Sequence, residues 1–132
     1  DFTLVHGSPR EPVWEYLLSE QSAKENFPSF QTPFCLAGHS HIPLAFEEGH
    51  KGVKFVHPVP PVIKLNKERL IINPGSAGQP RDGDWRASYM IFDSREKRIE
   101  LRRLSYNVTI TQEKMRKAGL PSYLIERLSR GQ

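Results

Sequence analysis

The apolar run from Phe34 to Ala37, closed by Gly38, constrains the fold of this 132-residue chain more than any other segment. A strand that is apolar on both sides needs cover on both of its faces, so it belongs in the centre of a layered sheet. Further strand-like runs are separated by 11 prolines and nine glycines, which favour turns. The expected strands are residues 2–5, 34–37, 42–46, 53–56, 62–65, 70–72, 88–92 and 99–104.

Two pairs of these strands are expected to form hairpins. Residues 88–92 and 99–104 alternate apolar with polar side chains and flank a polar turn, which is typical of an antiparallel pair. Residues 62–65 and 70–72 are expected to pair likewise through the turn 66–68. Many strands beside few helices predict an α+β fold in which at least one sheet face lacks cover from this chain.

Helices are expected near both ends of the chain. Val13, Trp14 and Leu17 recur at helical spacing, which predicts a helix from Val13 in which Trp14 is a packing residue. Residues 22–25 extend that helix or begin a second one. Near the C-terminus, Thr111 is expected to cap a helix, and a second short helix is expected after it.

Composition excludes several classes of protein. No apolar run approaches the roughly 18 residues of a membrane span. The single cysteine, Cys35, rules out a disulfide framework and is expected to be a buried thiol in a reducing cytoplasm. The net charge of +4 is mild, and the basic residues within 95–103 are interpreted as a solvated face rather than a nucleic-acid surface. The chain begins in a strand without an initiator Met, from which we expect it to start partway into a larger protein.

Three histidines stand directly after strand-like runs. His6 follows the strand 2–5, and His39 and His41 follow the buried run. Side chains at i and i+2 point the same way in extended backbone, but a turn after the strand would splay them toward two neighbouring ions. Imidazole binds Zn²⁺, Mn²⁺ or Fe readily, and ligands collect where buried strands end. A His-x-His pair alone is also common on surfaces, so the strand-end position of His6 is what favours a metal site.

A second candidate element is the polar loop that starts at Asn73. Its three glycines allow the backbone to approach an anion closely, and Arg81 offers a planar clamp for phosphate. The expected substrate-binding residues are Asn73, Gly75, Ser76 and Arg81. The alternatives are a tight surface turn for the glycines and a salt bridge from Arg81 to Asp82 or Asp84.

The strand-end histidines and the glycine loop occur in a recognisable order. The segments are Val5-His6-Gly7-Ser8-Pro9, Gly38-His39-Ser40-His41 and the run from Asn73 to Arg81. Together they resemble the C-terminal half of a calcineurin-like metallophosphoesterase. The resemblance is strongest to the small bacterial branch of phosphodiesterase or diadenosine-tetraphosphatase-like proteins. It implies that residues 1–132 are the C-terminal part of a single domain with a four-layer α/β/β/α sandwich fold.

The resemblance also implies a reaction and its cofactors. Phosphomono- or phosphodiesters would be hydrolysed by a hydroxide that two divalent metal ions activate. His6 and His39 would bind one metal and His41 the other. Mn²⁺ is the expected metal, with Fe, Zn or Ni as alternatives. The implied partner is a phosphate-ester substrate, with nucleic acid only as a substrate, and the uncovered sheet would also favour a homodimer.

The family's remaining motifs do not occur in this chain. Asp-x-His, Gly-Asp-x-x-Asp and Gly-Asn-His-Asp/Glu, which supply the other ligands and the general-acid histidine, are absent from the sequence. No catalytic residue is therefore expected within residues 1–132, so the chain alone is expected to be inactive and the intact protein to be the enzyme. The alternative is a non-catalytic scaffold of the same fold that serves as a binding or regulatory module.

Overall fold

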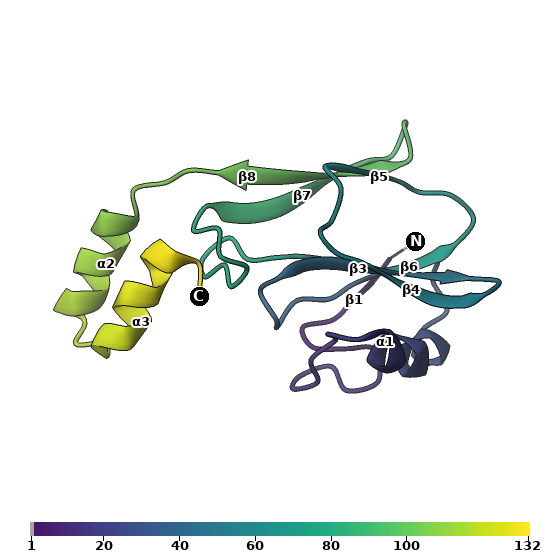
Figure 1. The fold of residues 1–132 in the computed structure, drawn as a ribbon, viewed down its shortest axis with the longest axis horizontal. Helices are drawn as coiled ribbons and strands as arrows, with labels where there is room; N and C mark the ends of the chain where they lie inside the picture. Colours follow the sequence, from purple (N-terminus) through teal and green to yellow (C-terminus); the bar gives the residue numbers. More distant parts are fainter. Residues whose placement is uncertain (1) are drawn as a thin grey trace.

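The computed structural model describes residues 2–132 and shows a layered α+β fold (Figure 1). The strands are β1 (Phe2–Leu4), β2 (Phe34–Leu36), β3 (Pro43–Gly49), β4 (Gly52–Val56), β5 (Val62–Lys64), β6 (Arg69–Pro74), β7 (Ala87–Asp93) and β8 (Arg98–Leu104). The helices are α1 (Glu20–Asn26), α2 (Val108–Lys117) and α3 (Ser122–Glu126), with short 3-10 turns after α1 and α3. A five-stranded sheet, ordered β1-β2-β6-β3-β4, lies between α1 and a three-stranded sheet, ordered β5-β8-β7. The predicted α+β class, mostly strands with few short helices, is confirmed.

Three neighbouring parallel strands form one side of the large sheet. β2 pairs in parallel with both β1 and β6, whereas β3 and β4 run antiparallel beside them. The register places Leu4, Leu36 and Ile72 side by side near the ends of their strands. The carboxyl ends of the three parallel strands therefore meet at one edge, which is where ligands bind in open sheets of this kind.

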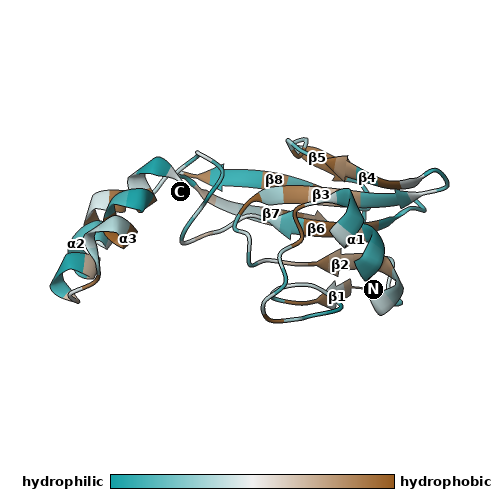
Figure 2. Ribbon diagram, turned by 60° about the horizontal axis from the view of Figure 1, so that its bottom comes forward, coloured by the Kyte–Doolittle hydropathy of each residue, from teal (hydrophilic) through white to brown (hydrophobic). Residues whose placement is uncertain are grey.

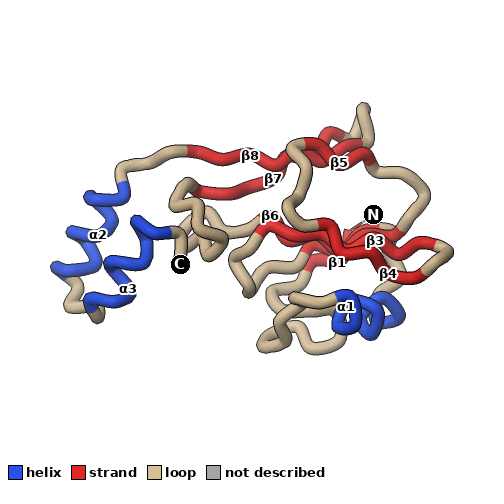
Figure 3. Tube along the Cα trace, in the orientation of Figure 1, coloured by secondary structure: helices blue, strands red, loops and turns tan. Residues whose placement is uncertain are grey.

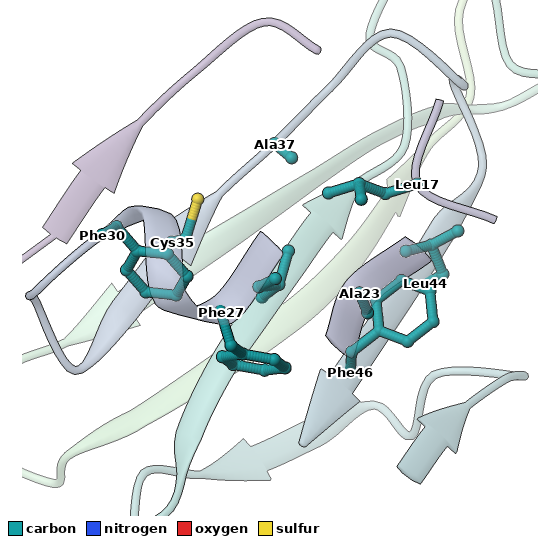
Figure 4. Packing of buried hydrophobic residues seen from close by; sticks show 9 residues of the cluster. Leu17, Ala23, Phe27, Phe30, Cys35, Ala37, Leu44 and Phe46 are labelled. Carbon is teal, nitrogen blue, oxygen red and sulfur yellow. The ribbon is translucent and has the colours of Figure 1, made fainter. Parts of the chain in front are cut away.

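The central strand β6 is covered on both faces. Along β6, Ile71 packs toward α1, whereas Leu70 and Ile72 pack toward the smaller sheet, because successive side chains point to opposite faces. Cys35 of β2 is buried on the α1 side with Phe27 (Figure 4). Hydropathy colouring shows the same apolar strands at the centre (Figure 2). The predicted central position of Phe34–Ala37 is confirmed, since β2 lies between β1 and β6, but only its α1 side is fully buried, and Phe34 and Leu36 on the other side are half-buried.

The last two helices lie beside the sheets rather than on them (Figure 3). α2 packs against α3 and has no buried residue of its own, whereas Ile125 of α3 and the following Leu128 are buried. The N-cap of α2 is Asn107, whose side chain accepts a hydrogen bond from Ile110, so the prediction of Thr111 as the cap is wrong. Within residues 2–132, no helix is both long enough and apolar enough to cross a membrane.

The predicted helix from Val13 is wrong. Residues 13–18 are irregular, and α1 begins at Glu20, where Ser19 and Ser22 form a reciprocal capping box. Trp14 is 75% exposed and is not the packing residue that its spacing suggested. The prediction that a helix covers residues 22–25 is confirmed by α1.

The predicted hairpin of residues 62–65 with 70–72 is also wrong. β5 pairs with β8 in the smaller sheet, whereas β6 lies in the middle of the larger one. The reason is burial: three consecutive apolar residues of β6 need cover on two faces, which a two-stranded hairpin does not provide. The hairpin β7–β8 forms as expected, and the predicted strands β3 and β4 also pair antiparallel. Asp1 lies outside the described residues, so the expected N-terminal strand is observed from Phe2 onward.

Candidate metal centre

His6 and His39 meet at the carboxyl edge of the parallel strands. The Nε2 atom of His6 lies 2.9 Å from the Nδ1 atom of His39, although 33 residues separate them in the sequence. The amide of Gly38 donates to the carbonyl oxygen of His6 at 2.9 Å, which holds the two strand ends together. Two nitrogens that each lie about 2.0–2.1 Å from one ion, at a right angle around it, are about 2.9 Å apart. This separation is that of a hydrogen bond between the two rings, and it equals the spacing of two ligand nitrogens on one metal ion.

His41 makes a different contact from that of His39. Both His39 and His41 adopt a left-handed backbone, with φ of 58° and 60°, so the chain turns between them. The Nδ1 atom of His41 lies 2.8 Å from the carbonyl oxygen of Gln79. Because a carbonyl oxygen only accepts, Nδ1 carries the proton and Nε2 keeps the lone pair that binds a metal. His39 and His41 thus have different hydrogen-bond partners, and their binding of separate ions stays a prediction.

The surroundings of His41 favour its neutral form. Burial lowers its pKa, the bond to Gln79 raises it in part, and the nearby charge of Arg81 lowers it further. A neutral imidazole is the form that binds metal ions.

The histidines supply only part of a donor set. Among the described residues 2–132, no three side chains of His, Cys, Asp or Glu gather closely enough to hold a metal ion. Metal sites in proteins usually need three or four protein ligands. The donors present thus fit a metal, but the site needs further ligands beyond this set.

Asn73 is bonded to the turn of residues 38–41, which we call the histidine turn because it carries His39 and His41. Its side chain is 2% exposed, and its Nδ2 atom donates to the carbonyl oxygen of Gly38 at 2.5 Å and to the hydroxyl of Ser40 at 2.9 Å. Its Oδ1 atom accepts from the amide of Gly75 at 2.9 Å. The structure thus places Asn73 beneath the turn that carries His39. Substrate contact by Asn73 stays a prediction, because its amide is already bonded to protein groups.

Gly75 and Ser76 shape the loop that follows β6. Gly75 has a φ of +83°, and a Cβ atom there would lie 2.8 Å from both the Pro43 ring and the Ser88 hydroxyl. The hydroxyl of Ser76 accepts from the amide of Gln79 at 2.9 Å. The glycine is thus required by close packing, and the serine closes the turn that presents the Gln79 carbonyl to His41. Substrate contact by these two residues likewise stays a prediction.

Arg81 lies beside His41, and its guanidinium is not used by the acids that follow it. Its amide donates to the carbonyl oxygen of His41 at 3.2 Å, and its Nη2 atom donates to the Gln79 side chain at 3.0 Å. Asp82 instead pairs with Arg103, and Asp84 pairs with Arg86 and Arg103, so the salt-bridge alternative for Arg81 is wrong. Within residues 2–132, its buried Nε atom has no hydrogen-bond partner.

The basic residues of β8 are balanced by acids. Arg98 pairs with Asp93 and Glu100, and Arg102 also pairs with Glu100. The side chains of this run are thus compensated locally, which agrees with the interpretation as a solvated face.

Tyr16 is a site residue that the sequence pattern missed. Its ring stacks on the imidazole of His39, with ring centres 4.0 Å apart and planes 30° apart, while the ring of His6 approaches His39 edge-on. The helical spacing around Tyr16 suggested packing, and no local signal in the sequence places this ring against a histidine 23 positions later.

Comparison with known proteins identifies the fold. A crystal structure of a metallophosphoesterase from Sphaerobacter thermophilus matches all of this chain at a TM-score of 0.93 and 47% identity, over 56% of that chain. The fold is that of a partial metallophosphoesterase domain. The hypothetical protein PH1004 from Pyrococcus horikoshii OT3 shares this fold at a TM-score of 0.72 and 18% identity, over 99% of this chain and 46% of its own.

A curated relative also matches nearly all of this chain and about half of its own length. The uncharacterized protein MJ0912 of Methanocaldococcus jannaschii is 40% identical over 133 residues, which covers 96% of this chain. The chain spans about half the length of this relative. No protein-family model matches the chain.

Proposed function

We propose that this chain is part of a metal-dependent phosphoesterase that hydrolyses phosphomono- or phosphodiesters. The observation that carries the proposal is the meeting of His6 and His39 at 2.9 Å, at the carboxyl edge of three parallel strands. Divalent metal ions bound at this edge supply positive charge that polarises a phosphoryl oxygen and acidifies water. The likeness to a metallophosphoesterase over the whole chain supports the same reaction class.

The chain's own residues would have distinct tasks. His6 and His39 bind one metal through the two nitrogens that already face each other, and His41 offers its Nε2 atom to a second. Arg81, which lies next to His41, holds an oxygen of the phosphate ester by a charge-assisted hydrogen bond. Asn73 and Ser76 keep the two loops in place.

We further propose that residues 1–132 are the C-terminal part of one domain and that an apolar groove receives the rest. A cavity of about 550 Å³ lies between the sheets, and Phe2, Leu36, Met90 and Phe92 line it. A neighbouring cavity of about 720 Å³ shares Phe2 and Phe92 with it. β1 and β7 stand at the edges of their sheets beside this surface. The relatives are about twice as long as this chain, and we propose that further strands, with the missing ligands and the general-acid histidine, pair at these edges.

The proposal also includes the identity of the metal, the branch of the family and the cellular location of the protein. We expect Mn²⁺ to support activity best and the substrates to be those of the small phosphodiesterase or diadenosine-tetraphosphatase-like branch. The single thiol, Cys35, is buried and unpaired, which suits a cytoplasmic protein.

The test uses the full-length protein that contains residues 1–132. Its metal content is measured by mass spectrometry, and its hydrolysis of p-nitrophenyl phosphate and bis-p-nitrophenyl phosphate is measured with and without Mn²⁺. His39→Ala and His41→Ala should each lower metal-dependent hydrolysis by more than about 100-fold, since even outer-shell partners of metal ligands are worth about 10–100-fold. His50→Ala, in the exposed turn between β3 and β4, is the matched control.

Two results would decide against this function. Near-normal hydrolysis in His39→Ala and His41→Ala would remove both residues from the metal centre. Bound metal in a wild-type protein that hydrolyses neither ester would favour the alternative of a non-catalytic scaffold, which the incomplete donor set within residues 2–132 also permits.

A further inference from the structure

The imidazoles of His39 and His41 are oriented by different contacts. The Nδ1 atom of His41 lies 2.8 Å from the carbonyl oxygen of Gln79, and a bond of this kind fixes the ring of most metal-binding histidines. Within residues 2–132, the ring of His39 has only His6 as a hydrogen-bond partner, at 2.9 Å. A metal ion that binds both nitrogens of that contact replaces the hydrogen bond between them. The ring of His39 then needs another contact to fix its orientation.

The ring of Tyr16 supplies such a contact. It stacks on the imidazole of His39, with ring centres 4.0 Å apart and planes 30° apart. The face of an aromatic ring is negative, and a metal-bound imidazole carries more positive charge than a free one, so metal binding strengthens this stack. The contact is made by the face of the ring, which tyrosine and phenylalanine share.

Tyr16 is held on both sides, although it lies outside any helix or strand. The carboxylate of the preceding residue, Glu15, accepts hydrogen bonds from Ser8 and Asn26, whose side chains are fully buried. The following residue, Leu17, is buried in the core beneath α1. The backbone of Tyr16 is therefore fixed before any metal binds, so the stack costs little further backbone entropy.

We propose that Tyr16 is a positioning residue that holds the imidazole of His39 in the orientation that binds metal. The inference rests on the proposed function, because it takes His6 and His39 as ligands of one ion. The apparent affinity of a site falls in proportion to the fraction of molecules in which its ligands are correctly oriented. Loss of one aromatic stack changes such a fraction by about two- to tenfold.

The experiment titrates the metal-free, full-length protein with Mn²⁺ in a calorimeter. Tyr16→Ala should raise the Kd of one bound Mn²⁺ ion by about two- to tenfold. Tyr16→Phe keeps the ring face and should bind Mn²⁺ as the wild type does. The protein loaded with Co²⁺ gives a second readout, because its visible absorption depends on the arrangement of the ligands. This spectrum should change in Tyr16→Ala and stay the same in Tyr16→Phe.

A matched control tests whether any exposed tyrosine matters. Tyr123 on α3 is 67% exposed, compared with 46% for Tyr16. Tyr123→Ala should therefore leave the Mn²⁺ affinity and the Co²⁺ spectrum unchanged. Urea unfolding checks that every variant is folded at the start of each titration.

Kinetics separate positioning of a ligand from contact with the substrate. Because Tyr16 acts through the metal, a large excess of Mn²⁺ should return the kcat and KM of Tyr16→Ala for bis-p-nitrophenyl phosphate to wild-type values. A raised KM at saturating Mn²⁺, together with an unchanged metal affinity, would overturn the inference, because Tyr16 would then contact the substrate itself.

Failure of the inference and failure of the proposed function give different results. An unchanged Mn²⁺ affinity in Tyr16→Ala, or an equal loss in Tyr16→Ala and Tyr16→Phe, would overturn the inference and leave the function intact if the wild type hydrolyses the ester. Metal binding without ester hydrolysis in the wild type would remove the function, while the affinities of the variants would still decide the role of Tyr16. A wild type that binds no metal would overturn both.

Discussion

Replacing Asn73 by alanine should destabilise the protein strongly, because one buried side chain serves three partners. Asn73→Ala removes hydrogen bonds to the Gly38 carbonyl, the Ser40 hydroxyl and the Gly75 amide. Each such bond contributes about 1 kcal/mol, and each buried group left without a partner costs about 1–3 kcal/mol. With relaxation of the surrounding loop, we expect the free energy of unfolding to fall by about 3–5 kcal/mol. Metal affinity should fall with it, because the same bonds hold the turn of His39.

The assay is urea unfolding of the full-length protein, followed by circular dichroism. With a denaturant slope of about 2 kcal/mol per molar urea, the midpoint should fall by about 2 M. Asn73→Asp keeps the size of the side chain and the bond from Gly75 but loses both donors, so it should be nearly as destabilising at neutral pH. Lys51→Ala, in the exposed turn between β3 and β4, is the control and should change stability by less than about 0.5 kcal/mol. Asn73→Ala stability within about 0.5 kcal/mol of the wild type would refute the reasoning.

Three further predictions concern packing and ionisation. Gly75→Ala should lower the free energy of unfolding by about 1–3 kcal/mol, because a φ of +83° is strained for alanine and the added Cβ atom would lie 2.8 Å from the Pro43 ring. An unchanged melting temperature would contradict this. Burial raises the pKa of Cys35 to about 12, so a thiol reagent at pH 8 should react only as fast as the protein unfolds, and rapid labelling of the native state would show the thiol to be accessible. Hydrogen bonds from Arg86 lower the pKa of Asp84 from 3.8 to about 2, so this pair should stabilise the fold above about pH 4 and lose that effect as the pH falls toward 2. Asp84→Asn should flatten the loss of stability over that pH range, and an unchanged acid profile would count against the pair.

Local patterns predicted the hairpin β7–β8, whose strands are close in sequence, from the alternation in 88–92 and 99–104. The apolar run of β2 predicted its place inside the sheet, although it does not identify the distant strands β1 and β6 as its partners. The same rule applied to residues 70–72 would have placed β6 in the centre of the sheet, since all three residues are buried. A short connection after residue 65 favoured a hairpin instead, although loop length alone does not decide which strands pair.

The loop before α1 depends on contacts between residues that are distant in the sequence, which local patterns do not reveal. The spacing of Val13 and Leu17 is compatible with a helix, but Glu15 takes its partners from Ser8 and from Asn26 on the next helix. Those hydrogen bonds form only after the chain has folded back on itself. The position of Tyr16 against His39 follows from them, and for this reason the sequence did not reveal it.

The histidine turn explains why the spacing of His39 and His41 was informative but insufficient. In extended backbone the two side chains would lie on one face and compete for one ion. Both residues instead have left-handed φ values, so the backbone turns here, and such values cost about 1 kcal/mol or more for each non-glycine residue. Asn73 donates two hydrogen bonds to this turn, and each contributes about 1 kcal/mol. Together they offset the backbone strain of the two histidines. A residue 32 positions after His41 therefore holds the turn that carries the His-x-His pair, and loss of Asn73 should free this turn to relax even where every histidine remains.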